Sequence, residues 1–390
     1  MNSTNEFIVF GAPDIQQAEI DEIVASMRTG WLGTGPKVAR FERDFATYKG
    51  TSSDYVAALN SCTAALHVSM IAANLEMGDE VITTAMTFCA TVNAIIHSGA
   101  TPVLADIDSR TLNINPSDIE SKITPKTKAI IPVHFAGRAC DMDAIMALAR
   151  KHNLFVIEDC AHAIETEWNG KKAGTFGNFG CFSFYVTKNV ATGEGGMVIA
   201  NSPENIARIK ILSLHGMSKD AWHRFSDKGY RHYYVAEPGY KYNMMDLQAA
   251  IGIHQLARVE DNWRKRQNIW KQYQNELKDF PIQLPSDPAP NTRHAYHLYT
   301  IMIDEKRANI SRDSFIEKMT EENIGVGVHY NCIADHPYYQ KQFGWSPDHY
   351  PVAKTVGRQT VSLPLSAKLS YNDISRIICA VKHSLGAAPT

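Results

Sequence analysis

The residues of this 390-residue chain that could do chemistry begin with one lysine and one aspartate, each beside an apolar run. Lys188 lies in FSFYVTKNVATGEGGMV (182–198), where an apolar run leads into a glycine-rich turn. Asp159 ends a second apolar run, LFVIED (154–159). Because burying a charge costs free energy unless the charge is paired or used, these two positions indicate a site. A buried lysine with a lowered pKa can act as a nucleophile and can carry protons.

A candidate anion site precedes both residues in the chain. Hydroxyl-bearing and small side chains follow the apolar run YVAALN and open a predicted helix: Ser61, Thr63, Ala64 and Ala65. A helix N-terminus attracts negative charge, and these side chains suit a phosphate. Ser183 adds a hydroxyl shortly before Lys188, and the glycines that follow allow close backbone approach.

A buried lysine, a buried carboxylate and a phosphate cradle together suit pyridoxal phosphate (PLP). The lysine would form a Schiff base with the aldehyde, and the aspartate would keep the pyridine nitrogen protonated, so that the ring accepts electrons. Each feature alone also has a structural explanation, because an aspartate at a strand end commonly caps a helix or pairs with a cation. From these residues alone, both explanations of Lys188 stay open.

The elements that must position these residues alternate between strands and helices. Short apolar runs predict seven strands, at 55–60, 80–86, 101–107, 128–135, 154–160, 181–185 and 196–200. Helical patterns lie between most of them, which predicts an α/β fold with a mainly parallel, helix-covered sheet of seven strands. Ligands bind such sheets at the carboxyl ends of the strands, where Asp159 is expected.

The pattern changes near Met244, where a long stretch with apolar residues at helical spacing begins. The Pro- and Asp-rich segment LPSDPAPNTRH (284–294) is typical of a linker, and mixed strands and helices follow it. We therefore expect a large domain over residues 1–250 and a small C-terminal α+β domain over residues 251–390, which the long helix enters.

Composition argues against several classes of function. A net charge of −2 with 21% charged residues gives no electrostatic reason to expect nucleic acid or an anionic membrane as partner. The N-terminal segment MNSTNEFIVFG lacks signal-peptide features, and no apolar run is long enough to span a membrane. The seven cysteines are scattered without a CxxC pair, which predicts reduced thiols and a cytoplasmic location.

Two further groups invite a chemical role but are better explained structurally. His134, Asp141 and Asp143 in PVHFAGRACDMD fit no metal-ligand spacing, and DMD more simply caps the helix that follows, so we expect no metal. Cys160, next to Asp159, is expected to be a small buried thiol.

The order of several motifs resembles the DegT/DnrJ/EryC1/StrS family of sugar aminotransferases, PLP-dependent enzymes with the type I fold of aspartate aminotransferase. The matching segments run in family order: WLGTGPKVARFE (31–42), NSCTAALH (60–67), GDEVITTAMTFCATVNAI (78–95), GATPVLADID (99–108), KAIIPVHFAGRACDMDAI (128–145), VIEDCAHA (156–163), FSFYVTKNVATGEGGMV (182–198) and GYKYNMMDLQAAIG (239–252). Near the C-terminus, RHAYHLY (293–299) and GVGVHY (325–330) are most similar to the branches that serve spore-coat polysaccharide and UDP-linked 4-amino-4-deoxyarabinose.

The resemblance implies roles for the residues around the cofactor. Lys188 would bind PLP covalently, and Asp159 would pair with the pyridine nitrogen. His162 would lie beside the ring, and Phe88 would stack on its other face. The phosphate would be held by Thr63, Ala64 and Ser183. Plain core packing is the alternative for Phe88, and capping or a core hydrogen bond is the alternative for His162.

The resemblance also implies a homodimer with shared active sites. In family members the asparagine of the GYKYN segment, here Asn243, reaches the phosphate of the neighbouring subunit's cofactor. Candidate contacts to a nucleotide-linked sugar are Gly33, Gly35, Lys37, Tyr185, Lys241, His329 and Tyr330, although Lys37 and Lys241 could equally be surface lysines. The segment 213–241 is unusually long and aromatic for a connection, so we expect it to reach the substrate or the partner subunit.

The implied activity is transfer of an amino group, with glutamate as the donor, to C4 of a nucleotide-linked 4-keto sugar. Pyridoxamine phosphate would be the intermediate form of the cofactor, and the product would serve surface polysaccharide, lipopolysaccharide included, or another glycoconjugate. Amination at C3 is an alternative. A family branch that acts as a dehydratase has histidine in place of the lysine, so Lys188 argues against that reaction. Intact Lys188 and Asp159 also argue against a non-catalytic regulator.

Overall fold

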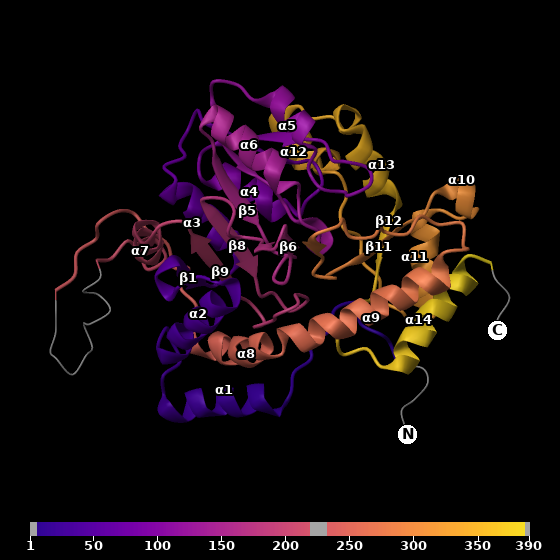
Figure 1. The fold of residues 1–390 in the computed structure, drawn as a ribbon, viewed down its shortest axis with the longest axis horizontal. Coiled ribbons are helices and arrows are strands. Elements are labelled where there is room, and N and C mark those ends of the chain that lie inside the picture. The colour runs from indigo at the N-terminus through magenta and orange to yellow at the C-terminus, as the bar shows by residue number, and fades with distance from the viewer. Residues whose placement is uncertain (1–5, 219–231, 387–390) are drawn as a thin grey trace.

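A computed structural model describes residues 6–218 and 232–386 of the chain, and its centre is a sheet of seven strands (Figure 1). In spatial order the strands are β1 (Val56–Leu59), β9 (Gly196–Ala200), β8 (Phe179–Ser183), β5 (Phe155–Asp159), β4 (Thr127–Ile131), β2 (Glu80–Thr84) and β3 (Thr101–Ala105). Each corresponds to one predicted strand. The sheet is parallel except for β9, which runs antiparallel to both β1 and β8. The prediction of a mainly parallel sheet is therefore confirmed.

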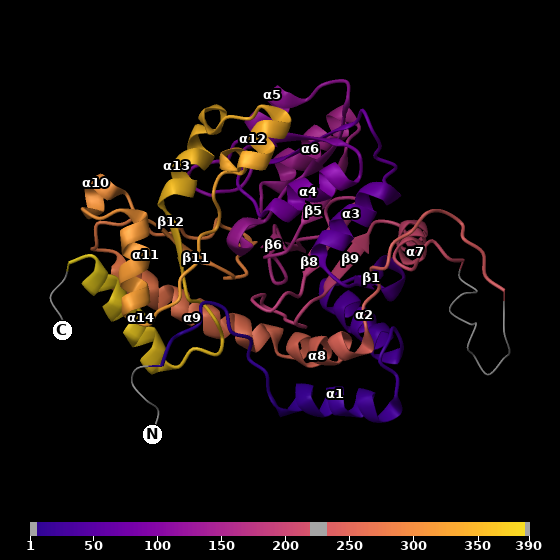
Figure 2. The same ribbon diagram turned by 180° about the vertical axis from the view of Figure 1, so that it is seen from behind.

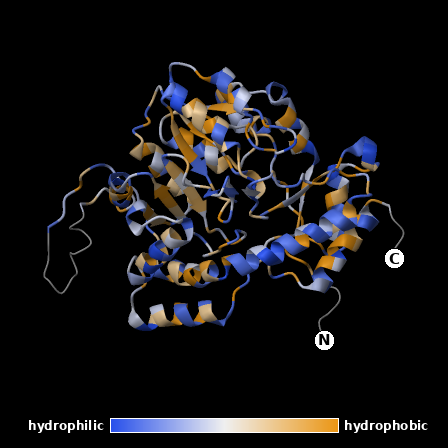
Figure 3. Ribbon diagram, viewed as in Figure 1, coloured by the Kyte–Doolittle hydropathy of each residue, from blue (hydrophilic) through white to orange (hydrophobic). Residues whose placement is uncertain are grey.

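Helices cover both faces of this sheet because successive strand residues point to opposite sides. In β1, Ala57 and Leu59 pack with α3 (Cys62–Ala72) and α7 (Pro203–Leu212). The alternate residues, Val56 and Ala58, pack with α2 (Pro36–Lys49) and α8 (Asp246–Ala257). The strands are apolar on both faces, as Figure 3 shows for the centre of the molecule. Other helices complete the layers: α1 (Gln17–Thr29), α4 (Cys89–His97), α5 (Pro116–Lys122) and α6 (Met142–His152).

The C-terminal part has its own core. The predicted long helix is two helices, since α8 ends at a break at Arg258 and α9 (Val259–Leu277) continues away from the sheet (Figures 1 and 2). There, β11 (Tyr299–Met302) pairs antiparallel with β12 (Thr360–Leu363). Helices α11 (Arg312–Glu321) and α14 (Tyr371–Ser384) pack on this pair together with α9.

The remaining elements are short. They are β6 (Glu167–Trp168), β7 (Lys171–Lys172), β10 (Thr292–Arg293), α10 (Glu305–Ala308), α12 (Pro337–Phe343) and α13 (Pro351–Gln359). Strand β10 lies within the segment predicted as a linker and pairs with β6. The division into domains at residue 250 stays a prediction, and Ile8 from the N-terminal end packs in the C-terminal core.

Two further expectations concern membrane-spanning helices and the long connection over residues 213–241. Within residues 6–218 and 232–386, no helix is both long enough and apolar enough to cross a membrane, and the cytoplasmic location stays a prediction. Much of the long connection, residues 219–231, lies outside the described residues. Its flanks pair with each other, since the Ser218 N–H donates to the Tyr234 carbonyl at 2.9 Å.

Candidate active site

A cavity of about 540 Å³ opens where the carboxyl ends of β5 and β8 meet the N-terminus of α3. Most of the residues proposed for cofactor or substrate binding line it: Thr63, Phe88, Asp159, His162, Ser183, Tyr185, Lys188, His329 and Tyr330. The edge of the sheet is the one expected for ligand binding in this architecture. The structure thus gathers side chains from widely separated parts of the chain into one cavity.

Lys188 lies on the segment that joins the antiparallel strands β8 and β9. Its backbone N–H donates to the Tyr185 carbonyl at 2.8 Å, which closes a turn and directs the residue to the cavity wall. Burial lowers the pKa of the Lys188 ammonium to about 8, and the nearby carboxylate of Asp159 opposes that shift. Among the described residues, none accepts a hydrogen bond from its Nζ, so the amine is available to a ligand.

Asp159 is held in place at the end of β5. Thr91 donates its hydroxyl proton to Oδ2 at 2.8 Å, and the Ala161 N–H donates to Oδ1 at 3.1 Å. Thr87 supports Thr91, because the two hydroxyl oxygens lie 2.8 Å apart and the Thr91 proton is already donated. Burial raises the pKa of Asp159, while these donors and the Lys188 charge lower it. An oriented carboxylate of this kind can accept a proton or a hydrogen bond from a ring nitrogen.

The N-terminus of α3 forms the opposite wall. Ser61 caps the helix by accepting the Ala64 N–H at 3.1 Å. Ala64, which was predicted to help hold the phosphate, therefore has its N–H already paired, and it does not line the cavity. Thr63 and Ser183 both line the cavity. Gly196 lets β9 approach the helix start, because a Cβ there would collide with the backbone at Ser61.

Aromatic and histidine side chains close the cavity from the other side. Phe88 is 57% exposed although Thr87 before it is buried, so its ring is free to stack on a planar ligand. His162 accepts the Ala136 N–H on Nδ1 at 3.2 Å, and its Nε2 lies 3.1 Å from the Tyr330 hydroxyl. Burial, with the charge of Lys188, holds the pKa of His162 well below its usual range. The neutral ring therefore carries its proton on Nε2 and donates to Tyr330, whose own hydroxyl proton is left for a ligand.

Five residues proposed for substrate or cofactor contact lie outside the cavity formed by this chain: Gly33, Gly35, Lys37, Lys241 and Asn243. They occur in two segments that pack together, since the Gly33 carbonyl accepts the Asp246 N–H at 2.9 Å. Asn243 donates to the Thr34 hydroxyl at 2.7 Å and accepts from the Lys241 ammonium. The Lys37 ammonium pairs with Glu22 of α1. Their roles stay predictions.

Sequence reasoning missed several residues of the cavity. Thr91 was not predicted, although it lies in GDEVITTAMTFCATVNAI (78–95), one turn after Phe88. Its hydrogen bond to the buried carboxylate of Asp159 cannot be inferred from residue spacing alone. His297, which does not line the cavity itself, was missed as well, and its ring packs against His162 with centroids 4.4 Å apart. Asn189 accepts a hydrogen bond from His297 Nδ1 at 3.0 Å, which connects this pair to the residue after Lys188.

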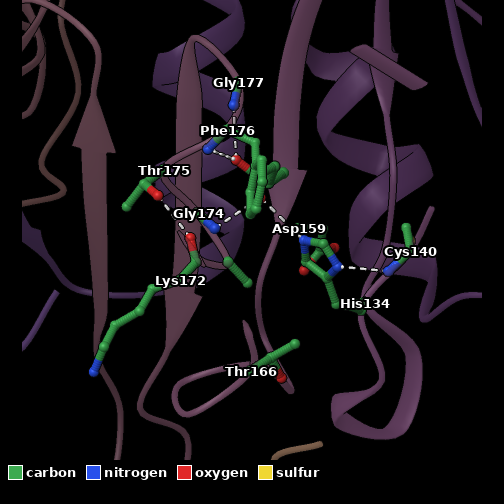
Figure 4. Close-up of polar contacts among 12 residues, drawn as sticks. His134, Cys140, Asp159, Thr166, Lys172, Gly174, Thr175, Phe176 and Gly177 are labelled. Atoms are coloured by element: carbon green, nitrogen blue, oxygen red, sulfur yellow. Dashed lines mark hydrogen bonds and ion pairs between the residues drawn. The ribbon is translucent and has the colours of Figure 1, made fainter. Parts of the chain in front are cut away.

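Asp141 and His134, two of the residues considered as metal ligands, have hydrogen-bond partners within the protein. Asp141 caps α6 by accepting the Ala144 N–H at 3.0 Å, as predicted from the sequence. His134 instead lies near Glu158 and Cys160, with ligand atoms within 4.8 Å of one another. The Glu158 carboxylate already accepts hydrogen bonds from His134 and from three backbone N–H groups (Figure 4). The expectation of no metal is not tested by this arrangement.

The donor set of the cavity fits PLP. An unpartnered lysine, an oriented carboxylate and a helix N-terminus with hydroxyls lie around one volume, and an exposed aromatic ring stands at its rim. A cofactor with an aldehyde, a basic ring nitrogen and a phosphate would use each of these groups. Bound there, it would supply an electron sink for carbanion chemistry.

Comparison with known proteins agrees with this fit. The model of the DegT/DnrJ/EryC1/StrS aminotransferase family matches residues 13–382. The chain is 47% identical over 379 residues to the spore coat polysaccharide biosynthesis protein SpsC of Bacillus subtilis, with 97% of both chains covered. It is 46% identical over 370 residues to the uncharacterized protein MJ1066 of Methanocaldococcus jannaschii, with 95% of both chains covered.

Solved structures show the same fold. The PLP-form of Spr1654 from Streptococcus pneumoniae superposes with a TM-score of 0.88 at 31% identity and covers 97% of this chain and 98% of its own. Helicobacter pylori PseC, an aminotransferase involved in the biosynthesis of pseudoaminic acid, gives 0.89 at 27% identity and covers 97% and 99%. The chain belongs to the DegT/DnrJ/EryC1/StrS aminotransferase family, whose members are PLP-dependent enzymes of the type I fold.

Proposed function

We propose that the protein transfers an amino group from glutamate to C4 of a nucleotide-linked 4-keto sugar, for the synthesis of an amino-sugar polysaccharide. The observation that carries the proposal is the placement of Lys188 and Asp159 in one cavity. The 47% identity to a spore coat polysaccharide biosynthesis protein over 97% of both chains supports the choice of product.

Lys188 is the proton carrier in this proposal. Its amine has no hydrogen-bond partner among the described residues, and burial places its pKa at about 8. Near neutral pH such an amine can both release and take up a proton, as transfer between a substrate carbon and the cofactor requires. Lys188 would also anchor the cofactor between turnovers.

Asp159 would hold the cofactor ring in its reactive form by stabilising a protonated ring nitrogen. The Thr91 and Ala161 donors fix its two oxygens, so the carboxylate keeps one orientation in the cavity wall. Phe88 would cover one face of the ring, while the α3 terminus with Thr63 and Ser183 would hold the phosphate. All of these residues line the cavity.

The sugar would enter over Tyr185 and over the hydrogen-bonded pair of His162 and Tyr330. Tyr185 is 44% exposed at the cavity edge, which leaves its hydroxyl for a ligand. His162 orients the Tyr330 hydroxyl toward donation, and the Ser362 hydroxyl lies 2.9 Å from Nδ1 of His329. A donor near a carbonyl oxygen favours the charge that develops there during amine addition.

A homodimer would complete each site. The segments that carry Gly33 and Asn243 pack together, and around them Trp31, Leu32 and Met245 are 56%, 45% and 43% exposed. Exposed apolar side chains clustered near polar groups are typical of interfaces. Asn243 of each chain would then reach the phosphate bound by the other, as in the relatives that the sequence resembles.

Product analysis tests the reaction. The holoenzyme is incubated with isotopically labelled glutamate and with UDP-, GDP- or dTDP-linked 4-keto sugars, and the labelled product is located by NMR. Label at C4 of one of these sugars is the expected result. The 3-keto isomers of these sugars are offered as separate acceptors. Transfer to them alone, with label at C3, would move the proposal to the neighbouring carbon, and no transfer from glutamate to any keto sugar would contradict it.

Subunit mixing tests the shared site. The variants Lys188→Ala and Asn243→Ala are each expected to be weak or inactive, but a mixed dimer contains one site with both native residues. Random reassociation should restore about a quarter of wild-type activity per chain, because half of the dimers are mixed and each has one intact site. No recovery after confirmed exchange of subunits would place Asn243 outside the partner's site.

A further inference from the structure

A second cavity, of about 480 Å³, lies at the opposite edge of the central sheet from Lys188. It is bounded by the end of α2, the start of β1, the end of β9 and the turn around β7. Its polar and charged lining consists of Lys49, Thr51, Tyr55, Lys171, Lys172, Thr175 and Asn201. Three lysines and no acidic residue are found among the described residues that line it.

The three lysines share an unusual environment. Among the described residues, none of the ammonium groups lies within ion-pair distance of a carboxylate. Each instead lies against an aromatic ring: Lys49 on Phe182 at 4.3 Å, Lys171 on Phe176 at 4.8 Å and Lys172 on Tyr48 at 3.7 Å from the ring centroid. Cation–π contacts stabilise these positions without neutralising their charge.

The carboxylates nearest to these lysines are already committed elsewhere. Glu260 accepts from Arg293 and, at 2.8 Å, from the Tyr48 hydroxyl. Glu167 pairs with Arg293 at 3.7 Å. Glu165 pairs with the buried Arg266, and Glu158 holds His134 and backbone N–H groups. Within the described part of the chain, these carboxylates are thus paired with other groups and form no direct ion pair with the three lysines.

The wall that carries Lys172 is fixed in shape before any ligand binds. Glu158 accepts hydrogen bonds from the N–H groups of Gly174, Phe176 and Gly177 at 2.7, 2.7 and 2.8 Å (Figure 4). The Thr175 hydroxyl donates to the Lys172 carbonyl at 2.7 Å in the same turn. On the other wall, Lys49 is 4% exposed and donates to the Ile164 and Ala173 carbonyls at 2.8 and 2.9 Å. Walls that are already fixed need little rearrangement when a ligand binds, which lowers the entropic cost of binding.

From these contacts we propose that the cavity binds a phosphorylated small molecule at a site separate from the aminotransferase centre. Lys171 and Lys172 supply ammonium donors from β7, and the buried Lys49 supplies fixed positive charge. Lysine is a common phosphate ligand, and the volume matches that of sites for nucleotide-sized molecules. The proposal does not depend on which sugar the enzyme aminates.

Calorimetric titration of the holoenzyme tests the site, with inorganic pyrophosphate and UDP as separate probes. The double variant Lys171→Met/Lys172→Met is expected to lose at least about tenfold in affinity for the second binding event, since two charge-assisted contacts are removed. The matched control Lys126→Met/Lys128→Met removes the same charge from two exposed lysines outside the cavity and should bind as the wild type does. Tighter binding of UDP than of pyrophosphate would identify a nucleotide, and equal binding would identify the phosphate groups alone.

A footprint on the wild-type protein gives a second, independent readout. Acetylation by acetic anhydride, followed by peptide mass spectrometry, should slow at Lys171 and Lys172 when pyrophosphate is present and stay unchanged at Lys151, which pairs with Glu120 at 2.7 Å. Unchanged titration of the double variant, equal loss in the control variant, or no protection of Lys171 and Lys172 would each overturn the proposal.

Discussion

The cavity that contains Lys188 and the cavity that contains Lys49 each have a lysine with a lowered pKa, and the two lysines differ in what their amines contact. Burial lowers the pKa of both Lys188 and Lys49 to about 8. The Lys49 ammonium donates to two backbone carbonyls and lies against the Phe182 ring. Lys188 has no such partners among the described residues and shares its cavity with the carboxylate of Asp159.

This difference shows that a lowered pKa does not by itself identify a catalytic lysine. Desolvation acts on both amines in the same direction. The amine of Lys49 is used to satisfy carbonyl groups, which makes it part of the structure, whereas the amine of Lys188 is left free for a ligand. Substitutions at the two positions distinguish these two uses.

The largest expected effect is the contrast between Lys188→Met and Lys49→Met. Loss of the free amine at 188 should lower the rate of amino transfer at least about 10³-fold, because both the cofactor anchor and the proton carrier are removed. Loss of the amine at 49 should lower the free energy of unfolding by about 1–3 kcal/mol, since two buried carbonyls lose their donor. Product formation and thermal unfolding measure the two outcomes. A catalytic loss at 49 as large as that at 188 would contradict the comparison.

The next effect concerns the adjacent carboxylates of β5. Asp159→Asn should lower the transfer rate about 10²–10³-fold, because an amide cannot hold the charge that stabilises a protonated ring nitrogen. Glu158→Gln is the matched control, because the Glu158 carboxylate accepts hydrogen bonds from backbone N–H groups away from the cavity that contains Lys188. This substitution should affect mainly the unfolding temperature. Single-turnover rates with glutamate and thermal unfolding curves measure the pair. Equal rates for Asp159→Asn and the wild type would remove Asp159 from the site.

The pH dependence of Lys188 gives a third prediction. Because burial disfavours the ammonium form, the pKa of Lys188 is lowered to about 8. The neutral amine therefore accumulates as the pH rises toward this lowered pKa. Acetylation of Lys188 in the cofactor-free protein should therefore accelerate about tenfold per pH unit below the pKa and then level off. Peptide mass spectrometry after brief labelling measures the rate. A midpoint near that of an exposed lysine, about 10.4, would show that the cavity does not lower the pKa.

The smallest expected effect is that of Thr91→Val. The variant keeps the shape of the side chain but removes the hydroxyl that donates to Asp159 at 2.8 Å. Loss of one hydrogen bond to a charged group costs about 1.5–3 kcal/mol, so the transfer rate should fall roughly tenfold to a hundredfold. Thr87→Val, one hydrogen bond further away, should have a smaller effect on the same rate. The reverse order would mean that the hydroxyl pair does not orient Asp159.

Much of the fold followed from the sequence because its strands are short apolar runs between helical patterns. LFVIED and CFSFY became neighbouring parallel strands, so Asp159 and Ser183 lie at one edge of the sheet as chain order predicts. The break between α8 and α9 was not predicted, because apolar residues continue at helical spacing across it. Arg258 at that break pairs with Glu19 of α1, a contact between distant parts of the chain that local periodicity does not contain.

The candidate site was predictable where single residues have distinctive chemistry and not where partners come from distant segments. Lys188 and Asp159 were evident because a charge in an apolar run needs an explanation. The link from Ala136 through His162 to Tyr330 joins three separate loops and appears only in three dimensions. The same holds for the basic cavity, where Lys49 and Lys172 come from distant elements.

The visible absorption spectrum of the PLP-loaded protein, before and after glutamate, tests the central claim most directly. The wild type should show a band that requires Lys188 and that glutamate bleaches as the cofactor is converted to its amine form. Lys188→Ala should lack this band. Identical spectra for wild type and Lys188→Ala would show that Lys188 does not anchor the cofactor and would contradict the account.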